Sequence, residues 1–438
     1  AQPEVSEHVL ENGLKVIVKE DHRAPVVVSQ VWYKVGSSYE YGGITGVSHI
    51  LEHMMFKGTQ KHAPGEFSRI VAENGGQENA FTGRDYTAYF ESLEKTRLPI
   101  GFELEADRMR NLRLTAQEFD KEREVVLEER RMRTDDQPHS KVYEYFSTVA
   151  HTNGGYQNPI IGWADDIRNL SINDLQDWYE LWYAPNNATL VVVGDVEPNA
   201  VFALANQFFG PLKKAEKPMN LKPRIEVEQV GQRRLNVRLP AELPYLIMGY
   251  KVPVLKTIGS EKDAYALEVL AGILAGGDSA RLAIRLIRGK QLVVNASAEY
   301  DLYARLTSLF LFDATPQQGH SLEQIEKALK AEVQELQTKP VASDELERVK
   351  AQVLADNIYD RDSVFHQATQ LGELETVGLG WQRMDQYVER IHEVTAADIL
   401  ASAKKYLTED KLTVAYLEPL PMDRNKPAPR GTGDFHAH

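Results

Sequence analysis

Two histidines and a glutamate near the start of the chain have types and a spacing that suit a metal site. His49 and His53 are four residues apart, so on a helix they share one face and both imidazoles can reach one ion. Glu52 lies at the edge of that face and is a candidate acid or base. Thr45 suits an N-cap and Gly58 a helix stop, so we expect a helix between them. Histidines with this spacing also occur on helix surfaces without a metal, so the prediction depends on a third ligand.

A third ligand has to come from another element, and the acidic stretch after Thr115 offers several. Thr115 and the glutamate three residues after it match a capping box, which predicts a long helix. Two imidazoles and one carboxylate leave one position of a zinc ion open to water, as is typical of hydrolytic zinc sites. Glu122 and Glu129 lie on one face of this helix, but spacing alone does not choose Glu129 over Glu124 or Glu128.

Together these residues resemble the zinc motif of the pitrilysin family. The order His49-x-x-Glu52-His53, with a later Glu-Arg-x-Val signature that runs from Glu122 to Glu129, is similar to half-length members such as mitochondrial processing peptidase. The resemblance implies a zinc-dependent endopeptidase or oligopeptidase in which His49, His53 and Glu129 hold one Zn²⁺ ion per chain. It also implies that Glu52 is the general base for a metal-activated water, and that Glu122 orients a ligand histidine.

The same resemblance points to residues that would contact a peptide substrate. Phe56 matches a residue that lines the pocket for the side chain after the cut, with plain core packing as the alternative. Residues 79–89 alternate in polarity like a strand, and at a sheet edge such a strand can bind an extended peptide as one more strand. The family likeness places Asn79, Ala80 and Thr82 beside the scissile bond, whereas an ordinary hairpin is the alternative.

Composition excludes several other classes of function. The formal charge of −14 argues against nucleic acid or an anionic membrane surface as a partner, since both favour a basic face. No apolar run is long enough for a membrane span. The lack of cysteine excludes disulfides and thiolate ligands. The sequence starts with Ala1, which suits either cleavage of a signal peptide or a chosen fragment; we favour the bacterial periplasm and leave the cytoplasm open.

With 438 residues the chain has room for two domains, and an internal repeat supports two. Residues 162–198 resemble residues 380–419, and each copy has a Ser or Thr N-cap, a helix and then an apolar strand. We predict an α+β fold of two homologous α/β domains, each an antiparallel-rich sheet packed with helices. We place the catalytic domain at 1–210, a proline-rich charged linker at 211–228, and a second domain without zinc at 229–438. By resemblance, the two domains form half of a clam-like chamber.

One part of the family pattern is absent from the second domain. Relatives carry an arginine and a tyrosine there that bind substrate and stabilise the oxyanion, and the matching positions here are Ile287 and Val294. Neither side chain can donate a hydrogen bond. We therefore predict a heterodimer with a homologous partner subunit that lacks the zinc motif and supplies this pair; a less active homodimer is the alternative.

Two other roles remain open within the same fold. The chain could be a dedicated maturase that cuts one small peptide, or a non-catalytic scaffold subunit. Scaffold relatives usually have broken zinc motifs, whereas His49, Glu52, His53 and Glu129 are all present here.

Overall fold

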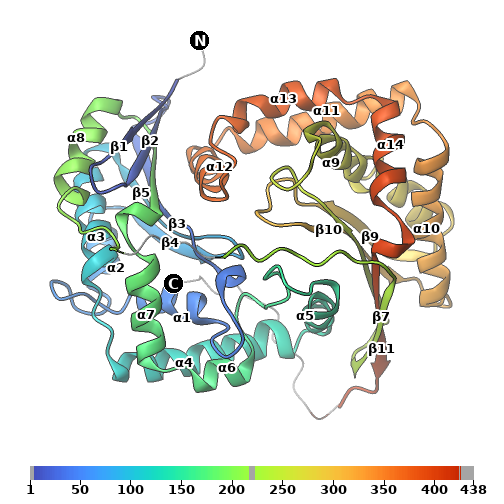
Figure 1. The fold of residues 1–438 in the computed structure, drawn as a ribbon, viewed down its shortest axis with the longest axis horizontal. Helices are drawn as coiled ribbons and strands as arrows, with labels where there is room; N and C mark the ends of the chain where they lie inside the picture. Colours follow the sequence, from blue (N-terminus) through green and yellow to red (C-terminus); the bar gives the residue numbers. More distant parts are fainter. Residues whose placement is uncertain (1–3, 217–221, 424, 426–438) are drawn as a thin grey trace.

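The computed structural model describes residues 4–216, 222–423 and 425, and it folds them around two sheets, one from each half of the chain (Figure 1). The first sheet has the strand order β1-β2-β6-β3-β5-β4, in which only β2 and β6 pair in parallel. Its strands are β1 (Val5–Val9), β2 (Lys15–Glu20), β3 (Val26–Tyr33), β4 (Gln77–Thr82), β5 (Thr87–Glu94) and β6 (Ala188–Gly194). The valine-rich β3 and β6 are buried along nearly their whole length, because helices cover both faces of the sheet.

Helices of the first half cover one face of that sheet and carry the predicted site, whereas α5 packs elsewhere. Helices α1, α3 and α8 pack against its strands, and α4 crosses α1. The helices are α1 (Val47–Met54), α2 (Glu66–Glu73), α3 (Leu98–Asn111), α4 (Ala116–Arg130), α5 (Pro138–Ala150), α6 (Ala164–Asn169), α7 (Ile172–Trp182) and α8 (Pro198–Phe209).

The second sheet repeats the plan of the first. Its order is β7-β11-β8-β10-β9, and β7 and β11 are again the parallel pair. The strands are β7 (Arg233–Pro240), β8 (Tyr245–Val252), β9 (Val293–Tyr300), β10 (Ser308–Pro316) and β11 (Leu412–Leu420). The predicted α+β class with two α/β units is therefore confirmed. The domain limits at 210 and 229 stay predictions, and residues 217–221 of the predicted linker lie outside the described residues.

The described part of the second half has six α-helices: α9 (Glu261–Ala275), α10 (Leu322–Thr338), α11 (Ser343–Asp360), α12 (Val364–Thr376), α13 (Arg383–Glu393) and α14 (Ala396–Tyr406). The two N-caps predicted from the repeat are present. Ser171 caps α7 and Thr395 caps α14, each in a capping box with an aspartate. None of the helices in the described parts of the chain has both the length and the apolar character that a membrane span requires.

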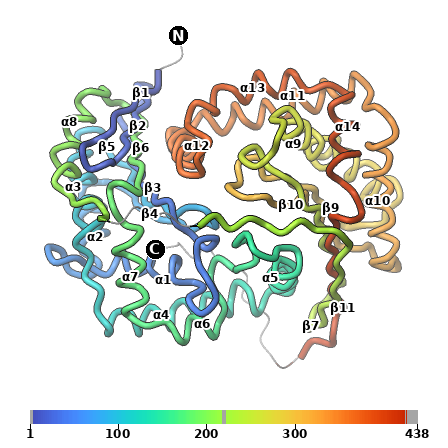
Figure 2. The backbone as a smooth tube through the Cα atoms, in the orientation of Figure 1, coloured from blue at the N-terminus to red at the C-terminus, as the bar shows by residue number. Residues whose placement is uncertain are grey.

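Each half covers the sheet of the other half with one helix. Helix α5 packs against β7, β8 and β11, where Val142 and Phe146 join the apolar cluster of the second sheet. In return, α12 packs against β3 and β6, where Leu371 joins Trp32 in a cluster on the first sheet (Figure 2). This exchange buries apolar surface between the halves, so it stabilises their relative position.

The predicted strand at residues 79–89 is two strands. The chain turns at Gly83, whose N–H donates to the carbonyl of Tyr86 at 2.8 Å, and β4 and β5 pair as an antiparallel hairpin. A single strand is therefore wrong here, since the turn interrupts the alternation. The edge position is nonetheless present, because β4 is the last strand of the sheet and, among the strands of the described residues, pairs only with β5.

The contact between α12 and the first sheet leads to a stability prediction. A Cβ added at Gly372 would lie 2.1 Å from Nε1 of Trp32, which is only 1% exposed and donates to Gln30 at 2.9 Å. Gly372→Ala should therefore lower the free energy of unfolding by about 1–3 kcal/mol, as measured by urea denaturation. Gly259→Ala is the matched control, because an added Cβ has no atom within 4 Å there. Equal stability of the two variants would contradict the close packing.

Candidate metal centre

The first backbone N–H groups of the helix that carries the two histidines bind a side chain other than the predicted N-cap, Thr45. Helix α1 follows Gly46, whose φ of +88° suits glycine, and the hydroxyl of Thr45 donates to Asp166 at 2.5 Å instead of capping the helix. The buried carboxylate of Glu40 accepts from the backbone N–H groups of Gly46 and Ser48 at 2.9 and 2.8 Å. The prediction that Thr45 is the N-cap is therefore wrong, because Glu40 satisfies these amides from outside the helix.

Three donor atoms from α1 and α4 lie close enough to share one ion. Nε2 of His49 is 3.7 Å, and Nε2 of His53 is 3.4 Å, from Oε2 of Glu129. The candidate ligand atoms of the three residues all lie within 4.8 Å of one another. Ligands about 2.1 Å from a tetrahedral zinc ion are about 3.4 Å from each other. The spacing and the types of these donors therefore fit zinc.

The structure also distinguishes Glu129 from the neighbouring acids. Glu128 is 55% exposed and pairs with Arg131 at 2.5 Å, and Glu124 is exposed. Arg133, in the π-helical turn Arg131–Asp135 after α4, lies 2.8 Å from Oε1 of Glu129, so Oε2 is the oxygen that faces the histidines. Sequence reasoning missed Arg133, although its spacing of four residues from Glu129 on a helix was a usable signal.

A second carboxylate holds the ring of His53 from its other side. Nδ1 of His53 lies 3.1 Å from Oε2 of Glu122, and Nζ of Lys57 lies 2.9 Å from Oε1 of Glu122. Burial raises the pKa of Glu122, but the bonds with His53 and Lys57 outweigh it and lower that pKa. These contacts fix the ring with Nε2 toward Glu129. By contrast, Nδ1 of His49 is buried and has no hydrogen-bond partner among the described residues.

The two histidines differ in charge when no metal is bound. Burial lowers the pKa of His49 to about 4. Burial acts in the same direction on His53, but hydrogen bonds to Glu122 and Glu129 outweigh it and raise the pKa of His53 to about 9. The pKa of Glu129 falls to about 2, because the bond from His53 and the charge of both histidines exceed the effect of burial. A metal ion must therefore displace a proton from His53, since only a neutral imidazole can bind it.

Glu52 lies beside the metal ligands. Its side chain is buried, and Thr82 on β4 donates a hydrogen bond from Oγ1 to Oε2 of Glu52. Burial raises the pKa of Glu52 to about 7, although the bond from Thr82 opposes it. A carboxyl group with a pKa near 7 can accept a proton and release it again at the same pH.

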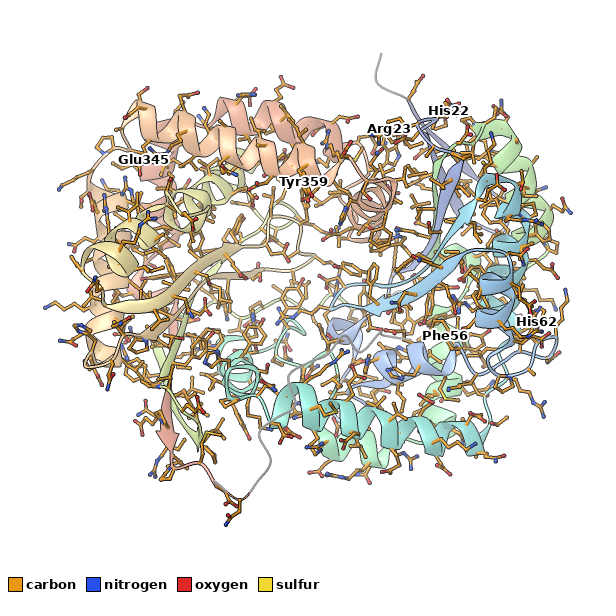
Figure 3. All side chains as sticks on the ribbon, turned by 180° about the vertical axis from the view of Figure 1, so that it is seen from behind. His22, Arg23, Phe56, His62, Glu345 and Tyr359 are labelled. Atoms are coloured by element: carbon orange, nitrogen blue, oxygen red, sulfur yellow. The ribbon has the colours of Figure 1, made fainter. Side chains whose placement is uncertain are left out.

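The metal cluster opens into a cavity of about 1480 Å³ between the two halves. His49, Glu52 and His53 line it together with Ala80 and Thr82 of β4, and strands of the second sheet form the far wall. Phe56 and Asn79 are not among the described residues that line this cavity. Phe56, beside α1 in Figure 3, is 9% exposed and lies under the guanidinium of Arg108 at 4.9 Å. Its contact with substrate stays a prediction.

Zinc binding should release about one proton per chain near neutral pH. Between the pKa of His49, about 4, and that of His53, about 9, His53 is the ligand that carries a proton in the metal-free chain. The apparent zinc affinity should therefore fall about ten-fold for each pH unit below about 8. Calorimetric titration with zinc in buffers of different ionisation enthalpy measures the protons released. Glu128→Gln should leave that number unchanged, and release of no proton by the native chain would contradict the assignment.

The comparisons with known proteins agree with this geometry. A family model described as Insulinase (Peptidase family M16) matches residues 15–163, and one described as Peptidase M16 inactive domain matches residues 169–353. Zinc protease PqqE of Helicobacter pylori is 33% identical over 413 residues, which cover 94% of this chain and 92% of that protein.

Solved structures share the fold of this chain. The crystal structure of a protease from Helicobacter pylori has a TM-score of 0.90 and 32% identity, and the match covers 95% of this chain and 100% of that chain. The periplasmic protease PqqL of Escherichia coli has a TM-score of 0.78 and 19% identity, over 95% of this chain and 48% of that one. The chain therefore belongs to the M16 (pitrilysin) family, as its motifs suggested, and it is a zinc metalloprotease of that family.

Proposed function

We propose that this protease hydrolyses peptides in the cavity, with His49, His53 and Glu129 holding one Zn²⁺ ion per chain. The observation that carries the proposal is the convergence of these three donors at the cavity wall, next to the buried Glu52. When bound there, zinc polarises a peptide carbonyl and lowers the pKa of a water molecule. The described residues contain one such donor group, which supports the proposal of one ion per chain.

Glu52 is the proposed proton carrier. Thr82 donates to Oε2 of Glu52, and Glu52 lines the cavity beside the histidines. Its carboxylate can take a proton from the attacking water and pass it to the leaving amine. Glu122 has a positioning role, because it holds His53 with Nε2 toward the other donors.

Strand β4 is the proposed binding site for the substrate backbone. It is the edge strand of the first sheet, so an extended peptide can pair with its outer side. Ala80 and Thr82 line the cavity, and the bond from Thr82 to Glu52 places this edge beside the proposed base. A peptide on β4, next to Asn79, Ala80 and Thr82, would present its backbone to the metal ligands.

Glu52→Gln tests the role of the base. This variant should keep the zinc content of the native chain, because Glu52 is not one of the three donors. It should lose roughly 10²–10⁴-fold in kcat, because an amide cannot take up the proton. Hydrolysis of a quenched fluorescent peptide and zinc analysis of the same sample measure both quantities. Glu128→Gln is the control for a carboxylate outside the cluster, and near-native activity of Glu52→Gln would contradict the mechanism.

A partner subunit is the second part of the proposal. Ile287 packs against the core of the second domain from the π-helical turn Ala283–Gly289, and Val294 is 51% exposed on β9. Neither can donate to an oxyanion. We propose that a homologous subunit without the zinc motif supplies an arginine and a tyrosine. The match to about half of the PqqL chain supports this, because the longer protein has room for a second such unit.

The isolated chain should therefore be a slow peptidase. Addition of the partner subunit, identified by co-purification from the native source, should raise kcat by about 10²–10³-fold, the usual effect of a lost oxyanion donor. The Glu52→Gln chain mixed with the same partner should remain inactive. Full activity of the purified chain alone would contradict the need for a partner.

We also propose a periplasmic location. The support is the description of PqqL, a protein of the same fold, as a periplasmic protease. A scaffold role without catalysis is disfavoured, because the three donors His49, His53 and Glu129 lie together and Glu52 lines the same cavity.

A further inference from the structure

The cavity wall opposite the metal cluster is formed by the second sheet. Strand pairing places Asp313 of β10 between Ser297 of β9 and Ile247 of β8, and places Leu311 of β10 beside Glu299 of β9. All five side chains line the cavity. These five residues therefore place two carboxylates next to two apolar side chains.

The carboxylate of Asp313 is held in a fixed orientation. Tyr245 donates from its hydroxyl to Oδ2 of Asp313 at 2.6 Å, and Ser297 donates from its hydroxyl to Oδ1. Tyr245 in turn stacks on His139 of α5, with ring centroids 3.9 Å apart and planes 11° apart. Burial and the charge of Asp313 both raise the pKa of Tyr245, so its hydroxyl stays a donor. The sheet thus presents Asp313 as an acceptor toward the cavity.

The charges of the far wall favour a positive ligand. Seven carboxylates and two guanidinium groups, those of Arg84 and Arg133, line the cavity. Glu128 and Glu144 pair with Arg131 and Arg130, and Glu52 and Glu129 belong to the proposed zinc site, whereas Asp313 and Glu299 lie on the far wall. Arg84 donates to the hydroxyl of Tyr143 and lies over its ring, and Arg133 pairs with Glu129. Among the described residues, no cation forms an ion pair with Asp313 or Glu299. Within the described ranges, no ion pair therefore neutralises the charge on the far wall.

We propose that this wall, formed by Asp313, Glu299, Tyr245 and Ser297, is a recognition site for a lysine or arginine side chain of the peptide. The positive group would bind Asp313, and its aliphatic stem would cover Ile247 and Leu311. The proposal rests on the proposed function in one respect, which is that peptides enter this cavity. It assigns the second domain a role in selecting substrates that carry positive charge.

Peptide binding to the inactive Glu52→Gln chain tests the proposal. The probes are neutral peptides with acetylated and amidated ends, each with one lysine at a different position, and the same peptides with norleucine in place of lysine. At one or more positions lysine should bind roughly ten-fold more tightly than norleucine, since a charge-assisted contact is gained. Asp313→Asn should remove that difference and leave the affinity for norleucine peptides unchanged.

Two further variants show whether the effect is local. Glu299→Gln should reduce the preference for lysine, whereas Glu418→Gln, an exposed carboxylate on β11 of the same sheet that does not line the cavity, should not. Lack of peptide binding, equal affinity for lysine and norleucine at every position, or a preference that persists in Asp313→Asn would each overturn the proposal. Hydrolysis of norleucine peptides by the native chain is measured separately, so failure of the proposed function is distinguishable from failure of this site.

Discussion

The crossing of α1 and α4 is the contact on which the rest of the structure depends. Helix α4 brings two carboxylates, two turns apart, to the two nitrogens of one imidazole: Glu122 lies at Nδ1 of His53, and Glu129 lies near Nε2. Buried charges are costly unless they are paired. Lys57 and Arg133 complete these pairs at the outer oxygens of the two glutamates, so the cluster combines ionised groups with low exposure.

The cavity exists because the chain that leaves α4 goes directly to the other half. After the π-helical turn Arg131–Asp135, α5 packs against the second sheet. Arg130 fixes this junction, since its buried guanidinium pairs with Glu144 at 2.6 Å and donates to the carbonyl of Gly162 at 2.8 Å. The metal ligand Glu129 and the far wall are therefore linked through one short, well-packed segment. A change in α5 would alter both the site and the wall.

Local patterns predicted the parts of the molecule whose geometry is set within one helix or strand. The spacing of His49 and His53 was sufficient for a shared helical face, whereas the edge position of β4 was indicated by the family resemblance and not by the local pattern. The cap of α1 could not be predicted, because Glu40 competes with Thr45 from outside the helix. The turn that divides residues 79–89 is local, since the N–H of Gly83 donates to the carbonyl of Tyr86 between the paired strands β4 and β5.

The sequence pattern did not predict features that depend on packing between elements distant in sequence. The rotation of α4 against α1 selects Glu129 over Glu128, and resemblance supplied that choice where spacing could not. The residues of the far wall of the cavity depend on long-range packing even more. Asp313, Ser297 and Tyr245 come from three strands, and only the register of β8, β9 and β10 shows that they are neighbours.

X-ray absorption at the zinc edge of the purified, zinc-loaded chain tests the central claim most directly. The account predicts one zinc ion per chain, bound by two imidazole nitrogens and a carboxylate oxygen at about 2.0–2.2 Å, with one position left for solvent. The imidazole signal should disappear when His49 and His53 are both replaced by alanine. A native chain that retains no zinc, or zinc without imidazole in its coordination, would contradict the account.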